Sequence, residues 1–472
     1  MVNMDITKPG HIDHAYKDRG EESPLIELPA LVKLFIALLA FCVGASFWIL
    51  PWYIVAFLFA GFCIGLAIFL NLYIAIIVFI IGTFFHPTYW IPQLQELHLA
   101  RNLAFVILLI WGFHSIIYRD FKIKTAPQNL AIAAFFLVGF LSTFNEFDYS
   151  FPFFLEVSSK ALALYFTIAN LIKTKNQLLF LVWFLVFINF TSALVGIYQY
   201  THHIGVYYAP EGILRISGFA EDANVYAMDL VISIPLAIAL FYSYKRFTIR
   251  SILVTIIGIL VVGTVLSFSR AGLVQLATVM FLSVGIRIIK KNKFIGILAI
   301  IIALAVMIPL VPQKYWERAG TITQFSDPAI GKRLAGWKVG TDLFTENPIT
   351  GVGFGMFRYE YFMKSITSSD VRFKMGLDAH NLYIHTAAET GIFGLTFLLI
   401  LIFLTLKYLN DAKKNFLAKG ERHLGEISSA LQISLLVYLL GGMFISYLQL
   451  LIFWIIIPLA VVLREFSLRD NG

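Results

Sequence analysis

Long apolar stretches recur along this chain at nearly regular intervals, separated by short polar connections. Each is close to the length of about 20 apolar residues that an α-helix needs to cross a bilayer. The stretches that predict spans are 31–49, 52–68, 70–86, 101–118, 127–145, 155–172, 177–199, 224–243, 251–268, 271–286, 294–311, 380–406, 431–447 and 449–463. The predicted fold class is an all-α polytopic membrane protein with 12–14 transmembrane helices, in which 31–86 holds either three spans or one long excursion.

One long polar segment interrupts this pattern, at about 312–379. It carries nine Lys and Arg side chains against seven acids, and apolar sequence resumes directly after it at His380. Apolar residues recur within it at roughly helical spacing, at Leu334, Trp337, Val339, Leu343 and Phe344. This spacing predicts an amphipathic helix over the bundle, ended by Asn347-Pro348, in one large and partly helical loop.

Cationic residues fall at every second connection between the spans. They form five groups, at 119–124, 173–175, 245–250, 287–293 and 407–422. By the positive-inside rule these connections and both termini face the cytoplasm, and 146–154, 200–223, the turn at Ser269-Arg270 and 312–379 face outward. The predicted organisation is a cytoplasmic tail (1–30), an N-terminal bundle (31–311, 11 spans, or 9 if 31–86 is one excursion), a periplasmic catalytic loop (312–379), C-terminal transmembrane helices (380–464) and a cytoplasmic tail (465–472).

Composition narrows the possible chemistry. Hydrophobic residues make up 59% of the 472 residues and charged residues 14%, whereas soluble domains average about 25% charged, which excludes a soluble protein. Cys42 and Cys63 lie in apolar runs and predict neither disulfides nor a Cys-based metal site. The His202-His203 pair lacks further ligands at a suitable spacing, so we expect no metal and no cofactor. The net charge of +8 reports orientation first, and no nucleic-acid partner is expected.

His380 is the leading candidate for proton transfer. It lies at the predicted start of a span, where Asp378 or Asn381 can cap the helix. Histidine is the side chain that gains and loses a proton near neutral pH. The alternative is an interfacial histidine that only satisfies a loop carbonyl. His385 lies on another face, and we favour a structural role for it.

Arginines and buried polar residues suggest an anion site. Arg270 lies at the outer surface, where its guanidinium suits phosphate, although an arginine reaching toward lipid headgroups fits equally well. Asp229 lies more than one turn inside a span and needs a cation, with Arg215 or Arg270 as its expected partner. A structural ion pair is the alternative. The Gly351-x-Gly353-x-Gly355 run lacks the context of a nucleotide-binding loop and predicts a close-approach turn.

Four motifs in order carry a family resemblance. They are Arg-x-Ser-Gly-Phe…Asn (215–224), Ser-Arg-Ala-Gly (269–272), Arg-x-x-x-Trp…Asn-Pro-Ile-x-Gly-Val-Gly (333–353) and His-Asn-x-Tyr…Glu-x-Gly-x-x-Gly (380–394). Over about 211–400 the sequence resembles the O-antigen ligase / Wzy polymerase superfamily of bacterial membrane glycosyltransferases. Up to 14 spans exceed the dozen or so usual there, and no long soluble appendage marks the protein-glycosylating branch.

The resemblance implies transfer of a glycan from undecaprenyl pyrophosphate, at the outer face of the cytoplasmic membrane, to a lipid A core sugar, another glycan or a protein hydroxyl. It implies inversion at the anomeric carbon without nucleotide sugar or metal. It places the catalytic residue at His380 and pyrophosphate contacts at Arg270 and Arg333, to which we add Arg215. The expected supporting residues are Asp229, Asn224, Trp337, Asn381 and Tyr383.

Two other functional classes share these features. A transporter or flippase of lipid-linked glycans would have the same bundle and basic cavity, and it predicts a pseudo-repeat and broken helices. The sequence shows neither of these. A non-catalytic assembly subunit would use the 312–379 loop as a docking surface. Membrane lipids surround the protein in every case, and the sequence does not distinguish ligase from polymerase.

Overall fold

The computed structural model describes residues 37, 52–84, 98–119, 123–203, 207–208, 214–220, 222–291, 328–367, 378–446, 448 and 450–469. The predicted spans 31–49 and 294–311 and the predicted N-terminal tail lie outside these residues, apart from Ala37. The chain forms two units, 1–70 and 71–472. The first contains α2 (Trp52–Leu70), an apolar helix that matches the predicted span 52–68.

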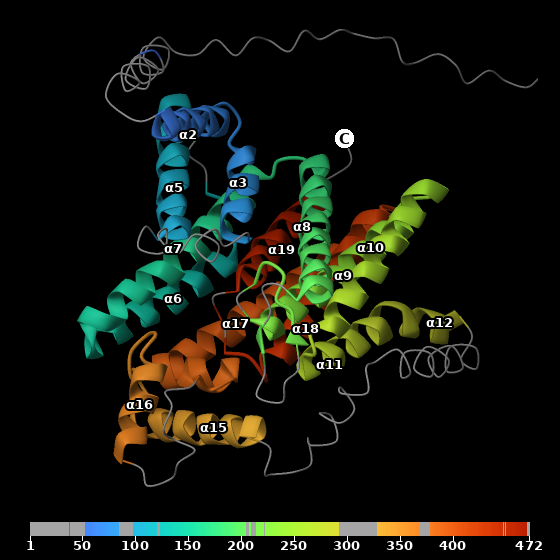
Figure 1. Ribbon diagram of the computed structural model, residues 1–472. Helices are drawn as coiled ribbons and strands as arrows, with labels where there is room; N and C mark the ends of the chain where they lie inside the picture. The colour runs from blue at the N-terminus through green and yellow to red at the C-terminus, as the bar shows by residue number, and fades with distance from the viewer. Residues whose placement is uncertain are drawn as a thin grey trace, which may run out of the picture. The chain divides into compact units, whose positions relative to one another are not determined.

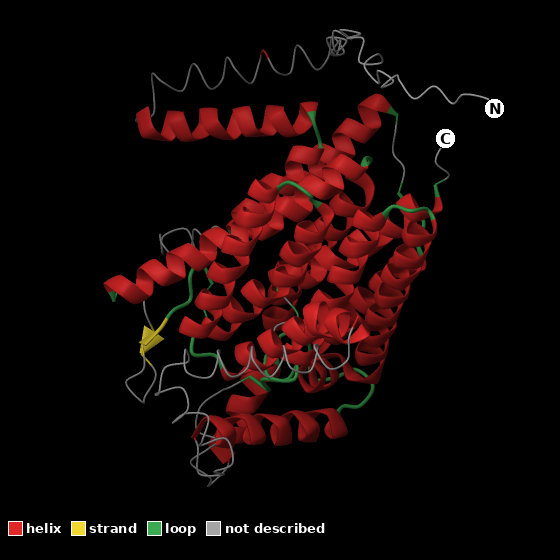
Figure 2. Ribbon diagram, turned by 90° about the vertical axis from the view of Figure 1, so that its right-hand side faces the viewer, coloured by secondary structure: helices red, strands yellow, loops and turns green. Residues whose placement is uncertain are grey.

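The second unit is almost entirely helical, as Figure 2 shows. Its helices are α3 (Tyr73–Phe84), α5 (Leu99–Tyr118), α6 (Pro127–Ser142), η2 (Thr143–Asn145), α7 (Phe147–Leu171), α8 (Lys175–His202), α9 (Ala223–Ser243), α10 (Phe247–Leu266), α11 (Arg270–Met280), the π-helical η3 (Phe281–Gly285), α12 (Ile286–Lys291), α15 (Pro328–Glu346), α16 (Phe357–Thr367), α17 (Leu382–Ala418), α18 (Arg422–Gly441) and α19 (Leu451–Leu468). Two short strands, β1 (Tyr207–Tyr208) and β2 (Leu214–Arg215), pair antiparallel. Nine of the described helices are long and apolar enough to cross a membrane, which confirms an all-α polytopic membrane protein.

Two helices form the centre of the bundle. Nearly every residue from Tyr226 to Leu240 on α9 is buried, as is the whole of α19 from Ile452 to Leu463. A helix that is apolar on all sides is expected to be covered on all sides. Helices α8, α10, α11 and α18 surround α9, and α7, α17 and α18 surround α19 (Figure 1).

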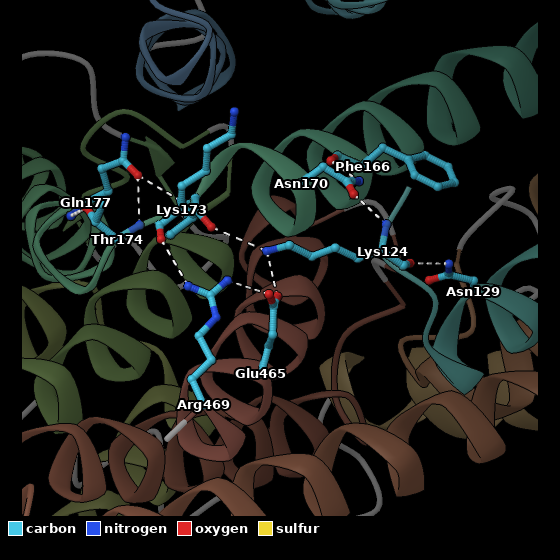
Figure 3. A network of polar contacts seen from close by, with 10 residues as sticks. Lys124, Asn129, Phe166, Asn170, Lys173, Thr174, Gln177, Glu465 and Arg469 are labelled. Carbon is cyan, nitrogen blue, oxygen red and sulfur yellow. Dashed lines mark hydrogen bonds and ion pairs between the residues drawn. The ribbon is translucent and has the colours of Figure 1, made fainter. Parts of the chain in front are cut away.

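The cation-rich connections meet at one end of this bundle. The Lys124 ammonium lies 2.7 Å from the Glu465 carboxylate, and the Lys124 backbone N–H donates to the Asn170 side chain at 2.8 Å (Figure 3). Arg469 pairs with the same Glu465 and donates to the Lys173 carbonyl. The ends of α7 and α19 and the beginnings of α6 and α8 are thereby held together. These connections therefore lie at one end of the bundle, as expected of loops that share one side of a membrane.

Several predicted boundaries are wrong. The connection 146–154 is mostly helix, because α7 already begins at Phe147, where Ser150 donates to the Phe354 carbonyl at 2.6 Å. Helix α17 extends to Ala418 and includes Lys407, because lysine is a good helix former whose charged end can reach water. Helix α3 has only 12 residues where 70–86 was predicted to span. Helix α19 continues to Leu468, into the predicted tail.

The expectation of unbroken helices is also wrong. Gly391 interrupts α17 with φ 65° and ψ −167°, a conformation that essentially only glycine adopts. The Gly-rich turn fills the gap: Val352 N–H donates to the Ala388 carbonyl at 2.9 Å, and Ile392 N–H donates to the Pro348 carbonyl at 2.8 Å. The turn therefore satisfies the backbone groups that the break frees. The close approach predicted for this glycine run is confirmed.

Candidate functional site

His380 lies directly before α17, in the left-handed backbone region with φ 47°. The next two backbone N–H groups fix this position. Asn381 donates to the Ser446 hydroxyl at 3.2 Å, and Leu382 donates to the Gly442 carbonyl at 2.7 Å. Of the two predicted capping residues Asn381 is the cap, because its side-chain oxygen accepts from the N–H groups of Tyr383 and Ile384. The imidazole is thus presented by a rigid backbone.

Asp378 has a different partner from the one predicted. Its carboxylate accepts two hydrogen bonds from Arg358 of α16, one of them at 2.8 Å from Nε. Burial alone would raise the pKa of Asp378, but the hydrogen bonds from Arg358 hold it below its usual range. Asp378 is therefore ionised. It fastens α16 to the turn that carries His380.

The surroundings of His380 favour the neutral imidazole. Burial lowers its pKa, and the charge of Arg333 on α15 lowers it further, while Asp378 and Asp222 act in the opposite direction. The Arg333 guanidinium lies 5.8 Å from the centre of the Phe444 ring. Helix α15 rests against this turn, since a Cβ at Gly336 would lie 2.9 Å from the Asp378 carbonyl oxygen. A neutral imidazole beside a guanidinium can accept a proton next to an anion.

A second cluster joins the Arg-x-Ser-Gly and Ser-Arg-Ala-Gly motifs. The side-chain oxygen of Asn224 accepts from Arg215 at 3.0 Å and from the Ser269 hydroxyl at 2.9 Å. Arg215 also donates to the Ser267 carbonyl at 3.2 Å. Ser269 caps α11, and Arg270 is the first residue of that helix. Asp222 is the N-cap of α9, where its carboxylate accepts from the Asn224 N–H at 2.7 Å.

Asn224 should contribute measurably to stability. We expect Asn224→Ala to lower the free energy of unfolding by about 1.5–3 kcal/mol, because one of the two bonds that it removes involves a charged donor. Asn224→Asp keeps an acceptor of the same shape and should cost less. Thermal unfolding of the purified variants measures both values. An alanine variant as stable as the aspartate variant would show that this acceptor contributes nothing.

The two clusters lie at the same end of the bundle. Asp222 acts on the pKa of His380 and is two residues from Asn224, which in turn bonds the cap of α11. Further along α11, Gln275 packs against Gly441 and donates to the Val437 carbonyl, near the end of α18 that also accepts the Leu382 N–H. The structure therefore brings the elements that carry Arg215, Arg270, Arg333 and His380 together.

The three remaining predicted supporting residues, Tyr383, Trp337 and Asp229, differ in their surroundings. Tyr383 donates its hydroxyl to the Leu439 carbonyl at 3.0 Å, which ties α17 to α18. Trp337 is half-buried on α15, one turn from Arg333. The ion pair predicted for Asp229 is wrong: among the described residues it has no cationic partner. Arg215 instead bonds Ser267 and Asn224 at the start of α9, more than a turn away from Asp229.

A cavity of about 120 Å³ lies beside Asp378. Its lining includes Arg358, Asp378, His385 and Glu389. Glu389 pairs with His385 at 3.0 Å and accepts from the N–H of Phe357, the first residue of α16, at 3.1 Å. Glu389 thereby links His385 to the first residue of α16. The contacts of Arg358 with Asp378 and of Glu389 with the Phe357 N–H were not predicted, because no local pattern links residues so distant in sequence.

No group of three or more His, Cys, Asp or Glu side chains within the described ranges could hold a metal ion.

The family comparison agrees with this geometry. A family model described as O-antigen ligase matches residues 255–399, a stretch that contains Arg270, Arg333 and His380 and ends within α17. No curated protein matches the chain. Arg215 and Asn224 lie before the matched stretch but bond directly to its Ser267 and Ser269. The match over residues 255–399 supports the resemblance of this chain to the O-antigen ligase / Wzy superfamily.

Proposed function

We propose that this chain transfers a glycan from undecaprenyl pyrophosphate to a hydroxyl acceptor, with inversion and without a metal ion. We place the site on the periplasmic face of a bacterial cytoplasmic membrane. The observation that supports this most is His380, held rigidly with a depressed pKa beside Arg333 in a segment that matches the O-antigen ligase family. Acceptors in this proposal are a lipid A core sugar, another glycan or a protein hydroxyl.

The proposed reaction is a single displacement. The acceptor oxygen forms a bond to the anomeric carbon, and its proton passes to the neutral imidazole of His380. The bond from that carbon to the pyrophosphate oxygen breaks, and its electron pair stays with the diphosphate. Arg270 and Arg333 stabilise this developing charge. Arg215 is only 8% exposed and already bonded, so we assign it to positioning the turn that carries Arg270.

The charges around His380 predict opposite shifts of the pH profile. Arg333 lowers the pKa of His380, so in Arg333→Gln the acidic limb of kcat/KM should move to higher pH. Asp378 raises that pKa, so in Asp378→Asn the limb should move to lower pH. Rates of transfer measured from pH 4.5 to about 8.5 test both directions. Lys332→Gln, an exposed neighbour on α15, is the matched control and should leave the limb in place. Shifts of the same sign in both variants would contradict this role of His380.

The decisive assay uses purified protein, a defined undecaprenyl-pyrophosphate oligosaccharide and a panel of hydroxyl acceptors, without nucleotide or ion gradient. We expect release of undecaprenyl pyrophosphate together with transfer of the glycan, unchanged by a chelator. The anomeric configuration of the product tests inversion. No transfer to any acceptor would contradict the proposal and favour transport or a scaffold.

The break in α17 is the one observation that favours a transporter. In transporters such breaks leave backbone groups available to the substrate or coupling ion. Here the backbone of 348–353 already bonds the groups on both sides of Gly391. The break in α17 therefore accommodates the Gly-rich turn and leaves these backbone groups bonded within the protein. For this reason we favour the transferase.

A further inference from the structure

Helix α16 has two different faces. Its inner face contains Phe357, Tyr361 and Ser365, each at most 3% exposed. The opposite face is apolar and open, with exposures of 44–63% at Tyr359, Phe362, Met363 and Ile366. These four positions follow the i, i+3, i+4, i+7 spacing of a single helix face. A continuous apolar face of this kind, which we call the α16 face, needs a covering partner.

Helix α15, which packs beside α16, has the opposite character. The exposed positions of α15 are mainly polar: Lys332, Lys338, Thr341, Thr345 and Glu346. The two neighbouring helices therefore present different surfaces. The outer side of α15 is polar enough to face water, whereas the α16 face is apolar.

The α16 face continues a surface that already suits lipid. The Tyr359 ring stacks on Tyr149 of α7, with ring centres 6.2 Å apart. Beside Tyr149, at the turn between α6 and α7, Phe144 and Phe147 are stacked and exposed at 60% and 43%. Further along α6, Leu137 and Leu141 are more than half exposed, as expected for a membrane span. Exposed apolar side chains thus continue from the span to α16, beside the exposed Asn145, Glu146 and Asp148 of the turn.

The length of α7 indicates where the contact between Tyr149 and Tyr359 lies relative to the hydrocarbon core of the bilayer. The Leu171 end of α7 belongs to the cation-rich end of the bundle. At 1.5 Å per residue, a hydrocarbon core of about 30 Å takes about 20 residues, which reaches back to about Phe151. Tilt of α7 moves this boundary toward Tyr149. Tyr149, and Tyr359 stacked on it, therefore lie at the opposite boundary of the hydrocarbon core.

We propose that α16 is an interfacial membrane helix, with its Tyr359, Phe362, Met363 and Ile366 face inserted among lipid acyl chains. Amphipathic helices bind bilayers in this way, lying in the interface plane with the apolar side inward. Through Arg358, whose guanidinium binds Asp378, the bilayer surface then sets the height of the turn that carries His380. This inference does not depend on the proposed transfer reaction.

Spin labels in nanodiscs that hold one copy of the protein test the proposal. In a background with Cys42→Ser and Cys63→Ser, single cysteines replace Phe362 and Ile366 on the α16 face, and Thr341 on α15 serves as the matched exposed control. Collisions with oxygen, which concentrates in lipid, are compared with collisions with a polar nickel chelate. We expect a positive logarithm of the oxygen-to-nickel ratio at both α16 positions and a negative one at Thr341.

Two results would overturn this proposal. Nickel accessibility at 362 and 366 equal to that at 341 would place the α16 face in water. Low accessibility to both reagents would place it against protein, as in a docked partner or an undescribed segment of this chain. The use of two positions guards against a local disturbance by either label.

Discussion

Replacing His380 by alanine is expected to lower the rate of glycan transfer by about 10²–10⁴-fold, the usual contribution of a general base. The neutral imidazole that burial and Arg333 favour would no longer receive the acceptor proton. Binding of the lipid pyrophosphate should change little, because the arginines remain. Initial rates at saturating donor, with donor affinity measured separately, distinguish these two effects.

The chain offers a matched control for this substitution. His203 is also a non-glycine residue in the left-handed region, with φ 54°, and it is exposed at the end of α8. His203→Ala makes the same backbone change at an exposed histidine that has no role in the proposed mechanism, and it should retain full activity. His380→Asn adds a second test, since asparagine tolerates this backbone region but cannot act as a base at neutral pH. Transfer by His380→Asn at the normal rate would remove His380 from the mechanism.

Replacing Gly391 by alanine is expected to destabilise the protein by at least about 3 kcal/mol, at the severe end of single substitutions. A Cβ at this position would overlap the carbonyl group of Ile349, which is backbone and cannot rotate away. Relief of that overlap would pull the Gly-rich turn out of the break and cost the hydrogen bonds of Val352 and Ile392. Thermal unfolding in nanodiscs measures the loss, and transfer should fall with it.

Gly420→Ala is the control that separates the steric effect of a Cβ from the cost of the left-handed backbone conformation. It has φ 74°, similar to the 65° of Gly391, but a Cβ there would have no heavy atom within 4 Å. Gly420→Ala should therefore cost only the left-handed backbone preference, about 1–2 kcal/mol. If the two alanine variants lost equal stability, the packing of 348–349 into the α17 break would be wrong.

Features encoded within a few residues were predictable from the sequence. Apolar length predicted α9 to within a residue, and Asn347-Pro348 predicted the end of α15. The cap Asn381 was one of the two candidates that the sequence offered, because a cap bonds backbone groups two or three residues away. Cation-rich connections were expected to lie at one end of the bundle, because they occur at every second loop along the sequence.

Features that depend on distant partners were not predictable. Gly391 breaks α17 because the backbone of 348–349 occupies its neighbourhood, and nothing adjacent to Gly391 signals that. Asp378 was expected as a possible cap, yet Arg358 of α16 binds it. Asp229 was given Arg215 or Arg270 as its partner, whereas Arg215 bonds Asn224 and Ser267. In each case the contact is made with a residue that is distant in sequence, so the local pattern could not identify it.

The convergence of two guanidinium groups and one imidazole on a single diphosphate is tested most directly by an experimental structure with undecaprenyl pyrophosphate bound in a nanodisc. We predict that Arg270 and Arg333 both contact phosphate oxygens, with His380 facing the terminal phosphate, to which the glycan is attached in the donor. A diphosphate bound elsewhere, or one that reaches only one of these three side chains, would contradict the account.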